Sequence, residues 1–260
     1  MTRQLVIIPT YNEIENIRAI TAAVLELSDP SFDILVVDDG SPDGTGAEVT
    51  KIAEEQPGRV FLLSRSGKQG LGTAYIAGFK WALEHEYDYI LEMDADFSHD
   101  PKSLPKLYEA CHSGGADVAV GSRYLTGINV VNWPLGRVLM SYFASLYVRT
   151  ITGMRVYDAT AGFVCYRAEV LRTIDLDKIH FKGYAFQIEM KYTATLCGFK
   201  IQEVPIIFVN RRLGVSKMSS SIFGEAFFGV LKMRYWSLTH KIPKTTGYET
   251  RREETTDPQR

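Results

Sequence analysis

Short apolar segments alternate with amphipathic segments through the first half of the chain, and this alternation restricts the fold more than any other feature. Strands that are apolar on both sides are typical of a parallel sheet covered by helices on both faces. We therefore predict an α/β fold with a mostly parallel sheet. The expected strands are residues 5–8, 34–37, 60–63, 89–93 and 117–121, and the expected helices are residues 13–27, 44–55, 73–84 and 103–111.

The second half is less regular, but its apolar spacing still indicates further elements. The expected helices are residues 133–152, 187–196 and 222–239, and the expected strands are residues 163–166 and 201–209. Residues 133–152 and 222–239 have wide apolar faces and are predicted to be amphipathic. Residues 241–260 are polar and without apolar periodicity, so we expect a disordered tail there.

Charge, apolar windows and cysteine usage narrow the class of protein. The net charge of −2 provides no overall attraction for nucleic acid, and we expect no nucleic-acid partner. No window reaches the ~18 consecutive apolar residues that indicate a spanning helix. The N-terminal apolar stretch is too short for a signal sequence. Three widely spaced cysteines form no disulfide or metal pattern. A cytoplasmic protein, soluble or peripheral to a membrane, is expected.

Acidic clusters follow two of the predicted strands. Asp38 and Asp39 begin the segment DDGSPDG after the second strand, and Asp94 and Asp96 follow the fourth. In a parallel sheet such strand ends meet at one edge, where ligands bind. Carboxylates there could accept hydrogen bonds from a nucleoside, or hold Mg²⁺ or Mn²⁺ together with substrate phosphates. The alternative for the first cluster is a capped turn before a helix, with Asp43 as the cap, and for Asp94 and Asp96 it is a surface turn with two solvated carboxylates.

Basic residues follow other predicted strands. Arg123 comes after the fifth strand, and Arg211, Arg212 and Lys217 follow the strand at residues 201–209. Arginine and lysine bind phosphates through charge-assisted hydrogen bonds. Acidic and basic groups at one sheet edge would suit a metal-bound diphosphate beside a second phosphate.

The glycines at positions 67, 70 and 72 do not form a dinucleotide fingerprint. After Gly70 and Gly72, Tyr75 occupies the position where that fingerprint has glycine or alanine. The sequence therefore disfavours a nicotinamide-dependent enzyme.

Six separate motifs give the chain a specific resemblance. Their order and spacing resemble those of the dolichyl-phosphate (polyprenyl-phosphate) mannose synthases, which are inverting GT-A glycosyltransferases of family 2, and the resemblance covers residues 5–217. It implies a GT-A, Rossmann-like fold. The motifs are residues 9–13 (PTYNE), 38–45 (DDGSPDGT), 70–75 (GLGTAY), 94–96 (DAD), 121–124 (GSRY) and 211–217 (RRLGVSK).

The resemblance assigns roles to individual residues. The nucleoside would be held by Pro9, Tyr11, Glu13, Val37 and Asp39, and the metal and donor diphosphate by Asp94 and Asp96 beside the Ala95 backbone. The phosphates at the reaction centre would contact Arg123, Arg211 and Lys217, and the lipid phosphate would contact Arg137 and Ser141, four residues apart on a helix, together with Arg123. Asp96, Arg123, Arg211 and Lys217 would be the catalytic residues. The chain departs from the pattern at Ser98, where some members have glutamine near the metal.

The implied reaction is transfer of mannose from GDP-mannose to a polyprenyl (dolichyl-type) phosphate by one in-line displacement with inversion, dependent on Mg²⁺ or Mn²⁺. An ionised phosphate acceptor needs little general-base help. Glu189 lies in the stretch where relatives with hydroxyl acceptors keep a catalytic acid, and the alternative for it is a structural role. Two alternatives stay open: the same fold with another donor such as UDP-glucose, and a catalytically silent membrane-associated subunit.

The resemblance also implies an organisation for the chain. Residues 1–220 would form the catalytic domain, residues 221–240 an amphipathic C-terminal helix and residues 241–260 the tail. Many family members add transmembrane helices after the catalytic domain, and this sequence resembles the type without them. We expect a peripheral protein at the cytoplasmic face of a membrane, with a small membrane-anchoring subunit as a candidate partner.

Overall fold

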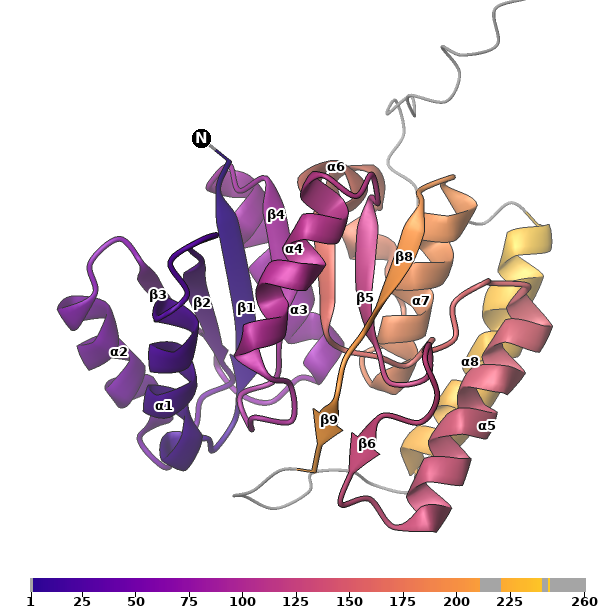
Figure 1. Cartoon of the computed structure of the whole chain (residues 1–260), viewed down its shortest axis with the longest axis horizontal. Coiled ribbons are helices and arrows are strands. Elements are labelled where there is room, and N and C mark those ends of the chain that lie inside the picture. The colour runs from indigo at the N-terminus through magenta and orange to yellow at the C-terminus, as the bar shows by residue number, and fades with distance from the viewer. Residues whose placement is uncertain (1, 211–220, 240–242, 244–260) are drawn as a thin grey trace, which may run out of the picture.

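The computed structural model describes residues 2–210, 221–239 and 243, and its centre is one seven-stranded sheet (Figure 1). The strand order is β3-β2-β1-β4-β7-β5-β8. Every neighbouring pair is parallel except those formed by β7, which runs antiparallel to β4 and β5. The strands are β1 (Gln4–Thr10), β2 (Asp33–Asp38), β3 (Val60–Ser64), β4 (Tyr89–Glu92), β5 (Val118–Ser122), β7 (Val164–Arg167) and β8 (Ile201–Pro205). The predicted α/β class with a mostly parallel sheet is confirmed.

Helices cover both faces of the sheet, as the apolar strands predict (Figure 1). Alternate strand residues point to opposite faces, so Val6 and Ile8 pack in one core cluster and Leu5 and Ile7 in the other. The first face carries α1 (Ile14–Leu25), α2 (Thr45–Glu55) and α4 (Leu104–His112), and the second carries α3 (Leu71–Glu84), α6 (Ala168–Thr173) and α7 (Tyr184–Leu196). Short 3₁₀ turns lie at Pro101–Ser103 and Leu176–Lys178.

Two long helices, α5 (Leu135–Thr152) and α8 (Ser221–Leu238), pack side by side beyond α7 (Figure 1). Val230 and Met233 of α8 are buried in a third apolar cluster that includes Val148 of α5 and Ile188 of α7. The predicted helix at residues 222–239 is therefore present, and one side of it belongs to the folded core. No described helix has the length and apolar character needed to cross a bilayer.

The predicted strand at residues 201–209 is wrong as a single element. The chain leaves the main sheet after Pro205, and β9 (Phe208–Val209) pairs in parallel with β6 (Val130–Val131) in a separate two-stranded sheet. The sequence does not reveal the break because it is apolar there as well, although Ile206 is buried and Ile207 is 63% exposed. The sequence also contains no clear signal for the short helix α6 or for the reversed direction of β7.

The carboxyl ends of β1, β2, β4 and β5 lie along one edge of the sheet. Pro9 of β1 is beside Val37 of β2, and Ile7 is beside Glu92 of β4. Glu92 and Val120 face the same residue of the intervening β7, Val164. The acidic and basic segments that follow these strands therefore start from a common edge.

Candidate functional site

The segment after β4 turns sharply and presents its two carboxylates differently. The side chain of Asp94 is 40% exposed, whereas Asp96 is buried. The Ser98 backbone N–H donates to Asp96 Oδ1 at 3.0 Å, and Phe97 has a left-handed φ of 58°. A local turn thus fixes the Asp96 carboxylate, while Asp94 faces outward.

These two carboxylates fit a metal that is shared with a substrate but not a closed protein cage. Within residues 2–210, 221–239 and 243, no group of three or more histidine, cysteine or acidic side chains has metal-binding geometry. Mg²⁺ typically binds through one or two carboxylates and completes its shell with water and substrate phosphates. Asp94 and Asp96 meet that requirement.

His99 lies directly behind the acidic segment. Its Nδ1 accepts the Asp94 backbone N–H at 3.3 Å, and its ring stacks on Phe163 at 4.8 Å. Burial lowers the His99 pKa to about 4, with Asp96 opposing the shift and Arg123 adding to it. His99 is therefore neutral at pH 7 and lies within electrostatic reach of both the acidic segment and Arg123.

Asp38 and Asp43 organise the turn after β2. Asp38 accepts hydrogen bonds from the Thr10 hydroxyl at 2.9 Å and from Ser41. Asp43 accepts the backbone N–H of Thr45 and of Ile14, which ties the turn to the start of α1. Although partial burial opposes ionisation, these hydrogen bonds lower the pKa of Asp43. Both carboxylates therefore shape this turn, but the N-cap position of α2 is Gly44 without a side-chain cap hydrogen bond, so the expected capping of that helix by Asp43 is wrong.

Asp39, in contrast, is buried beside a cation. Arg65 Nη1 lies 3.0 Å from Asp39 Oδ1, at ion-pair distance but without an aligned hydrogen bond. Burial raises the pKa of Asp39, and the Arg65 charge opposes that shift. The Asp39 carboxylate consequently retains acceptor capacity at the sheet edge. Tyr11 lies at the same edge, with Lys68 Nζ 5.3 Å from its ring.

Arg123 follows β5 and forms a buried ion pair. Its Nε and Nη2 donate to the two carboxylate oxygens of Asp158, each at 2.6 Å, and Nη2 also donates to Thr160. Asp158 is fully buried; burial opposes its ionisation, but the Arg123 guanidinium lowers its pKa. Backbone N–H groups of Tyr157 and Asp158 are held in turn by Glu203. The Arg123 guanidinium is thus oriented by a bidentate partner.

Arg137 and Ser141 lie one turn apart near the start of α5, as predicted. Arg137 Nη1 donates to Asn210 Oδ1 at 3.1 Å, and its guanidinium lies 4.0 Å above the Trp133 ring. These contacts join α5 to the segment after β9. The other predicted phosphate-binding residues, Arg211 and Lys217, lie outside the described residues, as does the predicted tail apart from Pro243.

Residues 5–175 match the family described as glycosyl transferase family 2. The chain belongs to this family.

Its relatives and structural neighbours agree with that membership. The chain is 48% identical to polyprenol monophosphomannose synthase of Mycolicibacterium smegmatis over 94% of its own length and 91% of the relative. It is 50% identical to undecaprenyl-phosphate mannosyltransferase of Micrococcus luteus over 91% and 94%. The chain also superposes on a solved structure of glucosyl-3-phosphoglycerate synthase from Mycobacterium tuberculosis, which is in complex with Mn²⁺, UDP-glucose and phosphoglyceric acid. The TM-score is 0.68 at 19% identity, and the match covers 90% of this chain and 80% of that structure's chain. The GT-A fold and a glycosyltransferase activity are thereby confirmed.

Two glycines of this glycosyltransferase show why the third motif has its residues. A Cβ at Gly72 would lie 2.7 Å from the Phe186 side chain, so the start of α3 packs directly against α7. Gly70 has a φ of 107°, and a Cβ there would lie 3.0 Å from Lys182. Here the glycines serve close backbone packing.

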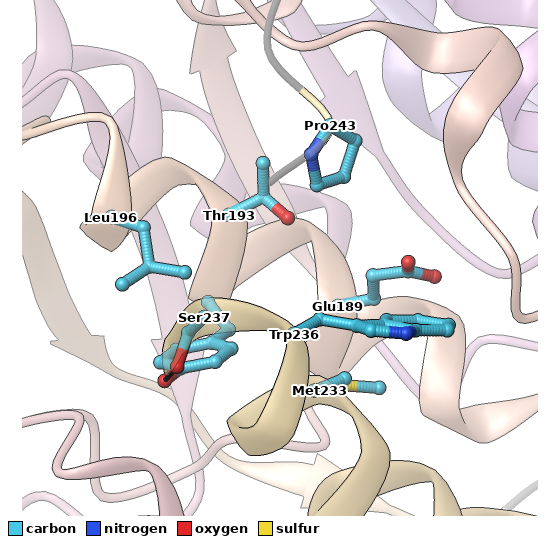
Figure 2. Close-up of a pocket in the computed structure, with 8 residues that line it drawn as sticks. Glu189, Thr193, Leu196, Met233, Trp236, Ser237 and Pro243 are labelled. Atoms are coloured by element: carbon cyan, nitrogen blue, oxygen red, sulfur yellow. Dashed lines mark hydrogen bonds between the residues drawn. The ribbon is translucent and has the colours of Figure 1, made fainter. Parts of the chain in front are cut away.

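Glu189 holds the segment before α7. Its carboxylate accepts the backbone N–H groups of His180 and Phe181 at 2.9 and 3.0 Å. It also borders a small pocket between α7 and α8, shown in Figure 2, which contains none of the residues predicted to bind donor, metal or acceptor. The structural interpretation of Glu189 accounts for all of these contacts.

Motif spacing does not reveal two charged residues around the site because their partners are distant in the chain. Arg65 is paired with Asp39, and Asp158 is paired with Arg123. The position of Arg65 directly after β3 is the one usable signal, since other strand ends also carry charged residues. Each of the three cysteines is buried and outside any disulfide.

Proposed function

We propose that this glycosyltransferase transfers mannose from GDP-mannose to a polyprenyl (dolichyl-type) phosphate, with inversion at the anomeric carbon. The main support is the near-complete alignment at about half identity with a polyprenol monophosphomannose synthase and an undecaprenyl-phosphate mannosyltransferase. The geometry of the sheet edge is compatible with this reaction, because acidic side chains and Arg123 start from neighbouring strand ends.

In this proposal the donor lies along the carboxyl ends of β1, β2 and β4. Pro9, Tyr11, Glu13, Val37 and Asp39 hold the nucleoside, with the open acceptor capacity of Asp39 available to a ribose hydroxyl or a base N–H. Asp94 and Asp96, beside the Ala95 backbone, hold Mg²⁺ or Mn²⁺. A metal held there would supply positive charge next to the departing diphosphate, and Arg211 and Lys217 would contribute further positive charge.

The acceptor phosphate approaches from the side of α5. Arg137 and Ser141 share one helix face and bind the phosphate together, while Arg123, held by Asp158, stabilises charge at the reaction centre. A phosphate monoester has a second pKa of ~6 and is largely ionised at neutral pH. The reaction therefore requires positioning and charge stabilisation more than a general base. This agrees with the contacts of Glu189, whose carboxylate accepts backbone N–H groups of the segment before α7.

The lipid substrate is reached through a surface that we call the α5–α8 apolar face. The two helices contact each other, with the Tyr147 hydroxyl donating to the Phe227 carbonyl at 3.0 Å. Large exposed apolar patches mark interaction sites, and apolar helix faces with basic and aromatic flanks bind membrane surfaces. We propose that this face docks on the cytoplasmic side of a membrane, directly or with a small anchoring subunit. Its exposed members are Leu139, Met140, Phe143 and Leu146 of α5 and Phe227, Phe228, Leu231 and Tyr235 of α8.

A donor panel tests the proposal. Purified protein would be incubated with a polyprenyl phosphate, Mg²⁺ or Mn²⁺, and GDP-mannose, GDP-glucose, UDP-glucose or UDP-galactose in turn. Release of nucleoside diphosphate that depends on the lipid phosphate should be fastest with GDP-mannose. Faster release from UDP-glucose would move the assignment to the alternative donor, and the absence of release with every donor would favour a catalytically silent subunit.

A further inference from the structure

A chain of fully buried polar side chains lies beneath the sheet edge. Gln187 of α7 donates from Nε2 to Glu92 Oε2 of β4 at 2.7 Å, and Lys191 Nζ donates to Gln187 Oε1 at 3.3 Å. The two ends of the Gln187 amide are thus matched, the N–H to a carboxylate and the oxygen to an ammonium group. We call these three residues, Glu92, Gln187 and Lys191, the buried relay.

Each end of the buried relay leads to one half of the candidate site. Glu92 is the last residue of β4, two positions before Asp94. At the other end, Lys191 Nζ donates to the Ala161 carbonyl at 2.6 Å. Ala161 follows Asp158 and Thr160, the two residues that hold the Arg123 guanidinium. Hydrogen bonds therefore run from Glu92, two residues before Asp94, through α7 to Ala161, in the segment that holds Arg123.

The location of α7 suits this role. Its first turn lies against the start of α3, where the Gly72 N–H donates to the Lys182 carbonyl at 2.8 Å. The helix then runs along the second face of the sheet (Figure 1). Gln187 contacts Glu92 of β4 and also lies beside Gly162, where an added Cβ would make an ordinary contact of 3.6 Å with Nε2.

Stability alone is a poor explanation for the buried relay. Glu92 and Lys191 are both fully buried, and burial disfavours the charged form of each: it raises the pKa of Glu92 and lowers the pKa of Lys191. Among the described residues, Glu92 Oε1 also has no hydrogen-bond partner. Apolar side chains of similar volume would fill the same space at least as well. What the hydrogen bonds of this buried network supply is a fixed geometry between the elements that they join.

We propose that Glu92, Gln187 and Lys191 are positioning residues that hold the segment 158–162, and through it Arg123, at a fixed distance from the Asp94–Asp96 carboxylates. The inference rests on the proposed function for the chemistry that Arg123 and the carboxylates perform. The relay residues touch no substrate; they act by fixing the relative positions of the groups that do.

Hydrogen–deuterium exchange tests the positioning directly, without any substrate. Lys191→Met removes the hydrogen bonds to Ala161 and Gln187, and loss of bonds from a charged donor should raise amide exchange in peptides spanning residues 157–163 ~tenfold. Thr193→Val, a near-isosteric change at a buried position of the same helix, is the control and should leave those peptides unchanged. Unchanged exchange in Lys191→Met, with the fold retained by circular dichroism, would overturn the proposal.

A reciprocal exchange of groups tests the catalytic consequence. Glu92→Gln replaces the carboxyl group by an amide, and Gln187→Glu removes the Nε2 donor. Displacement of a reacting group by about 1 Å can cost ~100-fold, so kcat should fall ~10- to 100-fold in each variant while the donor KM changes less than ~threefold. The double variant Glu92→Gln/Gln187→Glu restores one amide and one carboxylate beside Lys191. The kcat of this double variant should be at least ~tenfold higher than the kcat of the less active single variant.

The two readouts separate this inference from the proposed function. An inactive wild-type protein would contradict mannosyl transfer, while the exchange experiment would still decide whether the relay holds the segment. If the wild type is active, the positioning role of the buried relay would be overturned by a double variant whose kcat is no higher than that of the less active single variant. A donor KM that rises in parallel with the loss of kcat would overturn it as well.

Discussion

Acidic residues at the strand ends have similar sequence surroundings but different physical roles. Asp38 and Asp43 are occupied by hydroxyl and backbone donors, so they shape the turn after β2. Asp94 is partly exposed, and Asp39 is buried beside Arg65 with acceptor capacity left. The charge pattern predicts that acids gather at one edge, but only the fold shows which of them remain available to a ligand.

Asp96→Asn tests the metal assignment. The substitution removes one charge from the proposed metal site at constant size, and loss of a charge-stabilising group should lower kcat/KM at least ~100-fold. Metal-dependent donor binding, measured by calorimetry with and without Mn²⁺, should weaken as well. Asp100→Asn is the matched control, because Asp100 is exposed in the same loop and asparagine also caps helices well. Near wild-type turnover in Asp96→Asn would refute the assignment.

Asp158→Asn tests the ion pair behind Arg123 through its pH dependence. The folded-state pKa of Asp158 lies below the ordinary value of ~3.9, so its ionisation stabilises the fold above that value, and this contribution is lost as pH falls through the folded pKa. At pH 7 the variant should lose ~3 kcal/mol of unfolding free energy, since it leaves Arg123 buried without its anionic partner.

Urea denaturation of wild type and variant between pH 7 and pH 3 measures this effect. The difference in unfolding free energy between wild type and variant should become smaller as the pH falls towards 3, because the wild-type carboxylate becomes protonated and resembles the amide. If this difference in unfolding free energy stays constant from pH 7 to pH 3, ionisation of Asp158 does not stabilise the fold.

Arg137→Ala tests acceptor binding. Loss of a charge-assisted contact to the lipid phosphate should raise the acceptor KM ~tenfold or more and leave the donor KM within ~twofold. Arg149→Ala on the same helix is the control, because it removes an equal charge from a side chain that stacks on Tyr157. Equal changes in both Michaelis constants would place Arg137 outside the acceptor site.

At the scale of elements, the helices were more predictable than the arrangement of the later strands. The periodic patterns of α1 to α5, α7 and α8 locate these helices to within a few residues, because their buried faces recur at helical spacing. The antiparallel direction of β7 and the division of residues 201–209 into β8 and β9 were not predictable. Both depend on which strand a segment pairs with, and apolar composition carries no such information.

On α8, residues that pack in the core lie on one side, and residues of the surface proposed to dock on a membrane lie on the exposed side. Val230 and Met233 are buried against α5 and α7, whereas Phe228 is 70% exposed and Phe227 is 50% exposed. Deleting the helix would therefore expose core residues and could not isolate membrane binding. Substitutions on the exposed side separate the two roles.

Phe143→Glu and Phe228→Glu test the α5–α8 apolar face. Each removes an exposed aromatic ring, whose transfer out of water is worth ~2 kcal/mol, so binding to anionic liposomes should weaken at least ~tenfold per substitution. The melting temperature should change little because neither side chain is buried. Gln56→Glu, which adds the same charge directly after α2, is the control. Unchanged liposome binding in the double variant would exclude this face from membrane docking.

At the scale of the whole molecule, the fold and the family could be predicted because several motifs occur in order along one alternating chain. The site was only partly predictable. Asp94, Asp96 and Arg123 can be located at strand ends from sequence, but the contacts through Asp158 and the buried relay join residues far apart in the chain. Such pairings depend on three-dimensional packing, and local pattern does not encode them.

The most direct measurement is the formation of lipid-linked mannose. Purified protein would be incubated with GDP-[¹⁴C]mannose, Mg²⁺ or Mn²⁺ and a polyprenyl phosphate, and the organic phase would be extracted and its product analysed by NMR for anomeric configuration. The proposed reaction predicts a mannosyl phospholipid whose anomeric configuration is opposite to that of the donor and which forms only when both metal and lipid phosphate are present. Mannose that stays in the aqueous phase in the complete reaction, or a product with retained configuration, would contradict it.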